Sequence, residues 1–477
     1  MNVLIISSNR NRQPIAVLPL GACIVAEAAE RAGHAVTVLD LMFAGDVEKE
    51  LHQALLAVRP DVVGISVRNI DNNDMKKPRT FFQEVQSLTS MITKKTKATV
   101  VLGGAAISVM PEHFLRSTGA AMAVTAKGEI VFPELLTALE QKSDFRKIPG
   151  MAWMEEGVFR MNTLPPSPAP VSGPCFSPDF SRWIDIKAYR AGSSTIPLLT
   201  KRGCPFQCVY CTYSISEGRR YELFEPLTVV KEIGKLTSRG LRDIELVDNV
   251  FNAPYDHAME ICAHLARNKT GAHLQTMELN PQFVDDALLT AMEKAGFVGI
   301  GIAPESADDG VLKGLGKNYT ARHVRQAAQA VRRHKIPCFW IFLLGGPGET
   351  PATVERTLTF ARNNIRPSDT AFFTAGIRIY PGTELEWIAR REGILQVSAE
   401  EMLAPAFYLS PQLDGRWLTE RLSRAVRENL NFLDADSFVL PALEKILHWA
   451  PRLGFRQPLW RHTRAIRRGL QLLRIYG

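Results

Sequence analysis

Three cysteines lie close together in one short segment. The run GCPFQCVYC places Cys204, Cys208 and Cys211 at the spacing CxxxCxxC. Cysteine thiolates are the usual ligands of iron–sulfur clusters, and three of them on one loop can surround a single cuboidal cluster. Such a cluster leaves one iron without a protein ligand, where the amino and carboxylate groups of a small molecule can bind. The segment therefore predicts a catalytic [4Fe-4S] site.

A structural zinc site is the alternative for this segment. Structural zinc takes four ligands, commonly as two CxxC pairs, and the sequence has no second pair. The remaining cysteines, Cys23, Cys175, Cys262 and Cys338, show no ligand spacing. We expect Cys23 and Cys262 to be buried thiols on helices. Cys338 begins an expected strand, where the alternatives are a structural thiol and an inward-pointing catalytic one.

The elements around the cysteines alternate between strands and helices over residues 191–394. The expected strands are PLLTKRG, DIELVDN, LQTMEL, VGIGIAP, CFWIFLLG and FFTAGIRIYP. Repeated β-α units of this kind suit a partial (β/α)6 barrel, in which functional residues lie on the loops after the carboxyl ends of the strands. The three cysteines follow the first expected strand.

The flanking regions have different patterns. Residues 1–140 contain five β-α units, which predict a doubly wound, Rossmann-like parallel sheet with its ligand beyond the carboxyl ends of the strands. Residues 141–190 include TLPPSPAPVSGP, whose prolines favour an extended linker. Residues 395–477 read as a mostly helical C-terminal domain. The predicted fold class is therefore α/β with a helical C-terminal domain.

The barrel region resembles the radical S-adenosylmethionine (SAM) superfamily. After the cysteines, the segments LVDNVFN, GIGIAPES, FLLGGPGET and RIYPGT follow in the order of that family. The resemblance implies that Tyr210 packs near the adenine of SAM. It also implies that Asp248 and Asn249 lie near the methionine end, and that Glu305 and Ser306 occupy the position that contacts the ribose.

Further SAM contacts follow from the same resemblance. A carboxylate at Glu305 could accept hydrogen bonds from the ribose hydroxyls, as acidic residues do at nucleotide sites. The backbone N–H groups of Gly345 and Gly346 can approach a ligand closely, because glycine has no Cβ. Tyr380 in RIYPGT belongs to the same expected set of cofactor-binding residues.

The N-terminal region resembles the cobalamin-binding domain that precedes many radical SAM barrels. The matching segments are GISVRN, VLGGAAIS and VTAKGE. The resemblance implies that Gly103 and Gly104 let the nucleotide tail of cobalamin run close to the backbone, and that Ser66, Gly128 and Glu129 supply further contacts. A generic flavodoxin-like or receiver domain is the alternative.

One departure from the cobalamin-domain pattern concerns the cobalt. The DxHxxG loop that carries a histidine ligand in cobalamin mutases is absent, and the first loop reads SSNRNRQPIAVLPLG. The resemblance therefore implies a cobalt without a histidine ligand. We expect Arg68 to face the lower side of the corrin, where a cation disfavours a sixth ligand and eases methyl transfer. A surface salt bridge is the alternative for Arg68.

The resemblance implies a cobalamin-dependent radical SAM C-methyltransferase. Such an enzyme transfers a methyl group from methylcobalamin to a carbon of a small-molecule substrate, and it needs an external electron donor. Lipids, natural products and aromatic amino acids all remain open as substrates. A cobalamin-dependent cyclase or ring-rearranging enzyme is one alternative, and a non-enzymatic cobalamin or redox sensor is another.

Composition limits the location and the partners. The N-terminal run MNVLIIS has no basic leader, no stretch of 18 apolar residues occurs, and the cysteine count is odd, so we expect a cytoplasmic protein. The net charge is +8, but seven arginines fall between Arg452 and Gly477 without any acidic residue. No aromatic-rich basic platform accompanies that charge, so nucleic acid is not an expected partner.

The basic C-terminal segment has the pattern of an amphipathic helix. Leu459, Ile466, Leu470 and Leu473 recur at helical spacing opposite the arginines. We expect this helix to pack on the protein, for example over the barrel mouth. Peripheral contact with an anionic membrane is the alternative.

Overall fold

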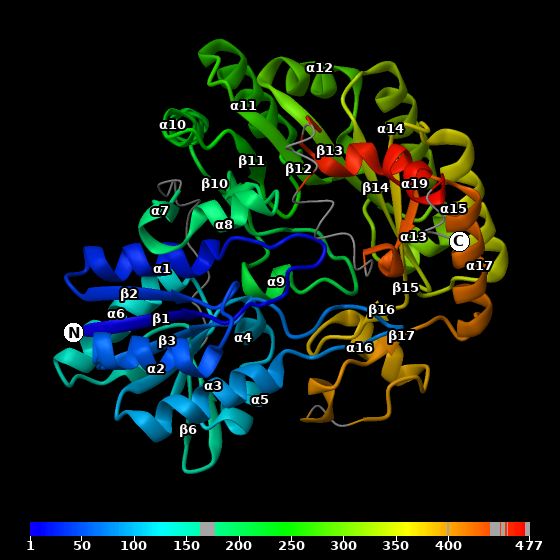
Figure 1. Cartoon of the computed structure of the whole chain (residues 1–477). Helices are drawn as coiled ribbons and strands as arrows, with labels where there is room; N and C mark the ends of the chain where they lie inside the picture. Colours follow the sequence, from blue (N-terminus) through cyan, green and yellow to red (C-terminus); the bar gives the residue numbers. More distant parts are fainter. Residues whose placement is uncertain (163–176, 398–399, 439–448, 450–453, 456, 473–477) are drawn as a thin grey trace.

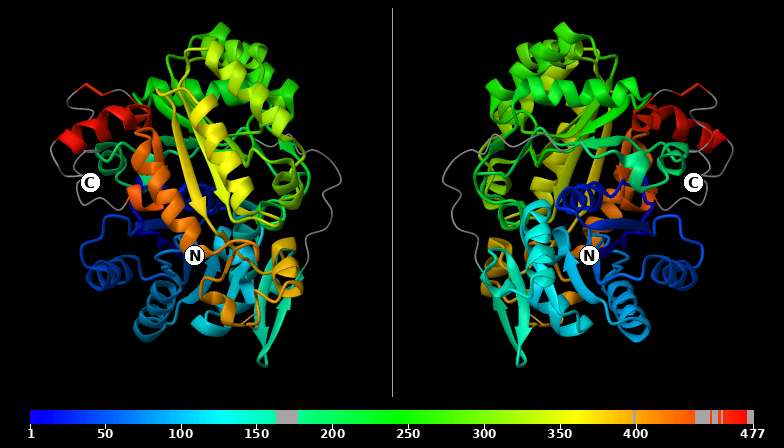
Figure 2. Two further views of the ribbon diagram at one scale, coloured as in Figure 1. Left: turned by 90° about the vertical axis from the view of Figure 1, so that its right-hand side faces the viewer. Right: turned by 90° about the vertical axis from the view of Figure 1, so that its left-hand side faces the viewer.

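Two seven-stranded sheets organise the chain. The computed structural model describes residues 1–162, 177–397, 400–438, 449, 454–455 and 457–472. Figures 1 and 2 show the N-terminal sheet and its helices on one side and the second sheet with its helices on the other. The expected linker segment TLPPSPAPVSGP and Cys175 lie outside the described residues.

The N-terminal sheet has the order β2-β1-β3-β4-β5-β6-β7. Its first five strands are parallel, whereas β6 and β7 form an antiparallel hairpin at one edge. The strands are β1 (Asn2–Ser7), β2 (Ala35–Asp40), β3 (Val62–Ser66), β4 (Thr99–Gly103), β5 (Met122–Val124), β6 (Met151–Glu155) and β7 (Val158–Met161). The helices are α1 (Leu20–Arg31), α2 (Val47–Val58), α3 (Phe82–Lys95), α4 (Ala105–Val109), α5 (Pro111–Thr118) and α6 (Gly128–Glu140).

Side chains of β1 alternate between two cores. Val3 and Ile5 belong to the cluster that includes residues of α1 and α6, whereas Leu4 and Ile6 belong to the cluster under α2, α3 and α5. A parallel strand that is buried on both faces reads as a continuous apolar run, as VLII does. The doubly wound α/β prediction is confirmed. The β6–β7 hairpin carries the sheet past residue 140, into the stretch that the proline content had suggested was linker.

The second sheet is entirely parallel, in the order β18-β15-β14-β13-β12-β11-β8. Its strands are β8 (Ile196–Leu198), β11 (Asp243–Leu246), β12 (His273–Leu279), β13 (Phe297–Glu305), β14 (Cys338–Leu344), β15 (Thr370–Ala375) and β18 (Phe432–Asp434). Within the described residues, β8 and β18 stay unpaired with each other, so the barrel is partial. The six expected strands are present, and β18 is a seventh from the C-terminal region.

Helices connect and cover these strands. The longer ones are α10 (Pro226–Ser238), α11 (Tyr255–Asn268), α12 (Asp286–Ala295), α13 (Asp309–Gly314), α14 (Ala321–Arg333), α15 (Pro351–Asn364), α16 (Glu384–Arg391), α17 (Gly415–Glu428) and α19 (Thr463–Leu472). Short helices are α7 (Phe180–Trp183), α8 (Ile186–Ala191), α9 (Tyr213–Ser216), η1 (Phe145–Lys147), η2 (Pro281–Phe283), η3 (Glu400–Leu403), η4 (Ala435–Phe438) and η6 (Leu459–His462). Two small hairpins pair β9 (Lys201–Arg202) with β10 (Glu222–Leu223) and β16 (Ile377–Arg378) with β17 (Phe407–Tyr408). No described helix is long and apolar enough to cross a lipid bilayer.

The long loop between β3 and α3 ties the two domains together. Asp71 of this loop accepts a hydrogen bond of 2.7 Å from Arg378 Nε, and both side chains are buried. Further along the loop, Lys76 donates to Asp436 at 2.8 Å. At the start of α6, Lys127 Nζ lies 2.6 Å from a carboxylate oxygen of Glu222. These contacts hold the carboxyl ends of the N-terminal strands against the barrel.

The C-terminal helix packs on the amino ends of the barrel strands. Thr370, at the start of β15, donates to the carbonyl of Trp460 at 2.9 Å. Arg467 is buried and donates to the Val426 carbonyl at 2.9 Å, near the end of α17. Leu459 and Leu470 are buried. The apolar face is therefore covered by protein, at the end of the barrel opposite its mouth.

Two details of the amphipathic prediction differ from this packing. Ile466 is half-buried, while Leu473 lies outside the described residues. The helix does not reach the mouth of the barrel in the part of the chain that is described, because η6 anchors it beside β15 and β14.

Candidate functional site

The three cysteines lie together on the loop after β9, where the chain leaves the first barrel strand. Cys204 is buried, whereas Cys208 and Cys211 are half-buried. Burial raises the pKa of the Cys211 thiol to about 12, and the neighbouring Cys208 and Cys204 add to that rise. Burial also raises the pKa of Cys204.

This donor set fits a cluster. No three His, Cys, Asp or Glu side chains of the described residues converge on one ion-sized point. A cubane cluster binds its thiolates at separate irons, so it requires sulfurs that are grouped but spread apart. Three neighbouring thiols on one loop meet that requirement.

Backbone hydrogen bonds fix the loop on both sides. The amide of Cys204 donates to the Gly218 carbonyl at 3.1 Å. The amide of Val209 donates to the Leu315 carbonyl at 3.1 Å, and the carbonyl of Val209 accepts from Leu385 at 2.8 Å. The cysteines are thus positioned by the segment after α9, by the end of α13 and by the start of α16.

Tyr210, Glu305 and Lys317 form a buried polar cluster beside the cysteines. The hydroxyl of Tyr210 donates to Glu305 Oε1 at 2.6 Å. Lys317 Nζ lies 2.8 Å from the Tyr210 oxygen and 3.1 Å from Glu305 Oε1. Burial alone would lower the pKa of Lys317, but the charge of Glu305 raises it well above the usual value. The expected residues Tyr210 and Glu305 are therefore brought together, with Lys317 as a partner that the sequence reading missed.

Glu305 ends β13 in a left-handed conformation, with φ of 59°. Residues other than glycine rarely adopt this conformation, and when they do they cluster at functional sites. Lys317 lay within the matching run GIGIAPESADDGVLKGLGKNYT, but nothing in its spacing marked it as a partner for Glu305.

Asp248 and Asn249 have protein partners in this structure. The two carboxylate oxygens of Asp248 accept from the Thr200 amide at 2.7 Å and from Lys201 Nζ at 3.1 Å. Asn249 donates to Glu217 at 2.8 Å. Asp248 thus anchors the strand end that precedes the cysteine loop. Its contact with the methionine end of a cofactor stays a prediction.

Ser306 and the glycine-rich turn also have protein partners. The buried Ser306 hydroxyl lies 3.2 Å from that of Thr357. Both glycine amides donate to one carboxylate oxygen of Glu349, Gly345 at 2.5 Å and Gly346 at 3.1 Å. Burial raises the pKa of Glu349 to about 7. This glutamate, in GGPGET, organises the turn, and the expected amide contacts with SAM stay predictions.

Several side chains around the cysteine loop have solvent-accessible surface, and yet burial shifts their pKa values. Tyr213 is 48% exposed, yet burial raises its pKa above the usual range. Arg68 is exposed as well, yet burial lowers the pKa of its guanidinium, against the opposing charges of Tyr213 and Glu245. Burial raises the pKa of the half-buried Glu278 to about 8, and the charge of Glu305 adds to the rise. Arg68 and Glu278 both influence the pKa of Tyr213, so the three side chains lie near one another, and we call the region that they share the interior space.

Arg68 lies where this space meets the N-terminal domain. It follows β3 and lines a pocket together with Ser8, Asn9, Arg10, Val67, Asn69, Phe81 and Glu84. It forms no ion pair with any residue that the structure describes, so the surface salt bridge is not observed. Helix α4 of the N-terminal domain contacts α9, directly after the cysteines. Tyr213 and Glu245 of the barrel influence the pKa of Arg68, so Arg68 lies close to the barrel.

The expected cobalamin contacts lie at the carboxyl edge of the N-terminal sheet, with protein partners of their own. A Cβ on Gly104 would come within 2.5 Å of the Val67 carbonyl oxygen, and one on Gly128 within 2.8 Å of Val25. Glu129 pairs with Arg202, next to the cysteine loop.

Gly103 and Ser66 end β4 and β3, opposite each other in the register. Tyr380 lies beside Arg378, whose guanidinium carbon is 4.9 Å from the ring centroid. Both strand ends and Tyr380 thus border the region where the two domains meet, and their contacts with cofactors stay predictions.

Comparisons with known sequences match both halves of the chain. The B12 binding domain matches residues 16–136 and the radical SAM superfamily matches residues 198–361. An uncharacterised methyltransferase of Pyrococcus horikoshii is 26% identical over 371 residues, which cover 77% of this chain and 77% of the relative. The tryptophan 2-C-methyltransferase of Streptomyces laurentii is 24% identical, over 80% of this chain and 73% of the relative.

A solved structure has the same fold over the whole chain. The radical SAM methyltransferase TsrM from Kitasatospora setae, with cobalamin and a [4Fe-4S] cluster bound, superposes with a TM-score of 0.85. It covers 99% of both chains at 23% identity. Both resemblances that the motifs indicated are confirmed. The chain therefore combines a B12-binding domain with a radical SAM domain.

Proposed function

We propose that this protein is a cobalamin-dependent radical SAM methyltransferase that places a methyl group on a carbon of a small molecule. The observation that carries the proposal is that the carboxyl ends of the strands of both sheets face each other. The cysteine loop at the barrel mouth contacts α4 of the N-terminal domain through α9. Ligands of open α/β sheets and of barrels bind at such carboxyl ends. The methyltransferases among the relatives support the same reaction.

Each bound group has residues that suit it. Cys204, Cys208 and Cys211 would hold the cluster, which supplies an electron when bound, while cobalamin supplies the transferable methyl group. Tyr210 and Glu305 offer an aromatic face and a carboxylate beside the cluster loop, as an adenosine requires. The short cation contact from Lys317 holds that carboxylate in place.

Arg68 is the residue that we assign to the face of the corrin. It follows β3, lies close enough to Tyr213 and Glu245 of the barrel for them to influence its pKa, and has no ion-pair partner among the described residues. A guanidinium stays protonated even when burial lowers its pKa. A cation at this position has no lone pair to offer as a metal ligand, so Arg68 would not bind the cobalt of a bound cobalamin.

The side chains around the interior space indicate which chemical groups a substrate carries. Glu278 has a pKa near 8, raised by burial, so it is mostly neutral at pH 7 and can donate or accept a proton. Tyr213 adds an exposed ring beside the same space. A small aromatic molecule with an N–H that donates a hydrogen bond suits these groups. Tryptophan is the first substrate to test, because it is the substrate that one relative's name states.

The test is methyl transfer by the reconstituted enzyme. Protein loaded anaerobically with iron, sulfide and cobalamin would be incubated with SAM carrying a deuterated methyl group, and with tryptophan or an extract of polar metabolites. We expect a product that carries the deuterated methyl on carbon, detected by mass spectrometry, and none from the Cys211→Ala protein. Deoxyadenosine without methyl transfer would instead indicate a ring-rearranging enzyme. No consumption of SAM at all would indicate a sensor.

A further inference from the structure

The exposed turn between α9 and β10 packs against the cysteine loop, on its outer side. We propose that Arg219 and Arg220 on this turn dock the acidic face of a one-electron carrier protein that reduces the cluster. The proposal rests on the cluster part of the proposed function. Each reduction moves one electron from the carrier to the cluster, so the carrier is oxidised as the cluster is reduced. The described part of the chain offers no second set of thiols at ligand spacing that could store that electron.

The turn lies directly on the backbone of the first ligand. The amide of Cys204 donates to the Gly218 carbonyl at 3.1 Å. Gly203 adopts φ of 76°, and a Cβ at this position would clash with the carbonyl oxygen of Arg220. Only glycine permits this approach. A protein bound at Arg219 and Arg220 would therefore be one backbone layer away from Cys204.

Apart from the exposed Pro205 and Gln207, the residues from Cys204 to Cys211 are half-buried or buried. Val209, between the second and third ligands, is buried and hydrogen-bonded on both sides by Leu315 and Leu385. The carbonyl of Gln207 contacts Gly316, where a Cβ would clash with it. The interior space is required by SAM and the substrate. The arginine turn is thus an exposed, charged place where a protein can come close to the cluster while the active site stays closed.

The charge of this turn is not neutralised by its surroundings. Arg219 and Arg220 are exposed, and neither pairs with a carboxylate of any described residue. The carboxylates nearby have other partners. Glu222 binds Lys127 at 2.6 Å, and Glu217 accepts from Asn249 at 2.8 Å.

Two free cations at this point attract a partner with an acidic face. Complementary charge raises association rates by roughly 10 to 1,000-fold at low salt, and the effect falls as ionic strength rises. An acidic flavodoxin is a suitable probe, because it is a protein that carries single electrons.

The experiment measures reduction of the cluster directly, by loss of its visible absorbance. Reconstituted wild-type protein and the R219E/R220E variant would be mixed anaerobically with reduced flavodoxin at low salt. We expect the variant to be reduced at least about tenfold more slowly. Both proteins should be reduced at the same rate by dithionite, which needs no docking surface. The wild-type rate with flavodoxin should fall as salt is added.

The matched control is R464E/R468E, which reverses two exposed arginines of α19 at the opposite end of the barrel. It should keep the wild-type rate with flavodoxin. Equal slowing by both variants would overturn the docking site, because net charge alone would then explain the effect. An unchanged rate for R219E/R220E, or a wild-type rate that ignores salt, would overturn it as well. Wild-type protein that binds no cluster would overturn the proposed function and this inference together, whereas a normal cluster with a normal R219E/R220E rate would overturn the inference alone.

Discussion

The two ends of the barrel both bury charged side chains, but they use them differently. At the amino end, Arg366 and Asp369 form an ion pair with both guanidinium–carboxylate contacts at 2.8 Å. At the carboxyl end, Lys317 and Glu305 form a pair at 3.1 Å beside the cysteine loop. The first pair is surrounded by backbone groups that complete its hydrogen bonding, whereas the second borders an interior space.

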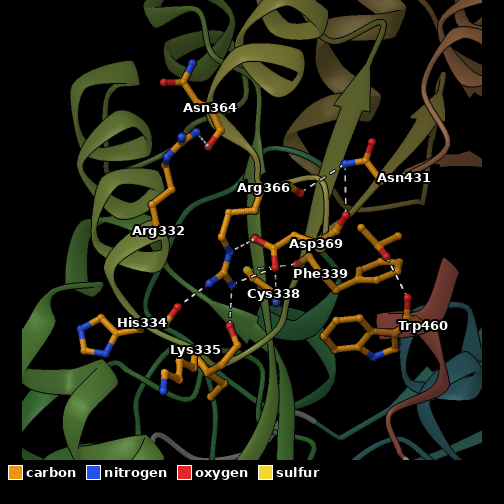
Figure 3. A network of polar contacts seen from close by, with 12 residues as sticks. Arg332, His334, Lys335, Cys338, Phe339, Asn364, Arg366, Asp369, Asn431 and Trp460 are labelled. Atoms are coloured by element: carbon orange, nitrogen blue, oxygen red, sulfur yellow. Dashed lines mark hydrogen bonds and ion pairs between the residues drawn. The ribbon is translucent and has the colours of Figure 1, made fainter. Parts of the chain in front are cut away.

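The amino end is a closed network (Figure 3). Asp369 accepts from the Cys338 amide at 3.1 Å, and Arg366 also donates to the carbonyls of His334 and Ile336. Asn431 donates to the Asp369 carbonyl at 3.1 Å. These bonds join the starts of β14 and β15 to the residue that precedes β18. Cys338 is fully buried here, in the apolar core that also contains Trp340 and Phe342, which favours the structural thiol.

The carboxyl end contains carboxyl oxygens that lack a hydrogen-bond or ion-pair partner among the described residues. One oxygen of the buried Glu349 has no hydrogen-bond partner among the described residues. Burial raises the pKa of Glu278 to about 8, and no described residue forms an ion pair with it. Unsatisfied groups of this kind cost stability and are kept where a ligand or a reaction uses them. At the amino end the indole N–H of Trp460 also lacks a partner among the described residues, so the comparison teaches that unpaired carboxyl groups, more than burial or unpaired polar atoms in general, separate the functional end from the stabilising end.

The largest contrast should come from cysteines at the two ends. Cys204→Ala removes a cluster ligand, so we expect loss of the cluster absorbance and of all methyl transfer, with little change in Tm. Cys338→Ala removes a fully buried side chain, so we expect a normal cluster and a lower Tm, from a loss of about 1–2 kcal/mol of stability. Iron content, visible spectra and thermal unfolding measure these effects. A Cys338→Ala protein without a cluster would contradict the division between the two ends.

The next contrast compares the two buried pairs. Arg366→Met leaves the Asp369 carboxylate without its partner, which should cost about 3–5 kcal/mol of stability while the affinity for SAM stays the same. Lys317→Met also destabilises the protein, but it frees Glu305 from the position beside Tyr210. We therefore expect it to weaken SAM binding at least about tenfold, which is about 1.4 kcal/mol.

Equilibrium dialysis with labelled SAM and thermal unfolding, carried out on the same preparations, measure both effects. Equal loss of SAM affinity in the two variants would show that the binding defect comes from general destabilisation. A Lys317→Arg protein, which keeps the cation, should recover part of the affinity.

The sequence predicted the two sheets and their helices well, because these elements depend on the local pattern of apolar residues. Continuous apolar runs such as VLII and alternating β-α segments predicted both sheets. The spacing CxxxCxxC predicted the cluster ligands, and that role stays a prediction. The sequence did not reveal β18, a strand of three residues that exists because β15 offers an edge. The β6–β7 hairpin was missed because its neighbouring prolines suggested a linker.

Partners across long stretches of sequence were harder to foresee. Asp71 and Arg378 are separated by 307 positions, and no local pattern links them. The role of Glu349 as acceptor for the Gly345 and Gly346 amides was also missed, although GGPGET contains all three residues. Motifs name the residues of a segment, but only packing decides which of them contacts a ligand and which holds the segment in place.

The smallest effect concerns the pH dependence of the side chains around the interior space. The pKa of Glu278 is about 8 in the folded protein, compared with 4.5 for an unperturbed glutamate. The folded state therefore binds more protons than the unfolded state between these values, and stability falls as pH rises through that window. Glu278→Gln removes the ionising group. Without cofactors, the Tm of the wild type should fall more between pH 5 and pH 9 than the Tm of Glu278→Gln. We expect the Tm difference between the variant and the wild type to grow by about 2 °C over this range. Glu134→Gln, at an exposed position on α6, should show no such gain. Parallel curves of Tm against pH for Glu278→Gln and the wild type would mean that this carboxyl group titrates normally. The mouth of the barrel would then lack the costly buried carboxyl group that distinguishes it from the amino end.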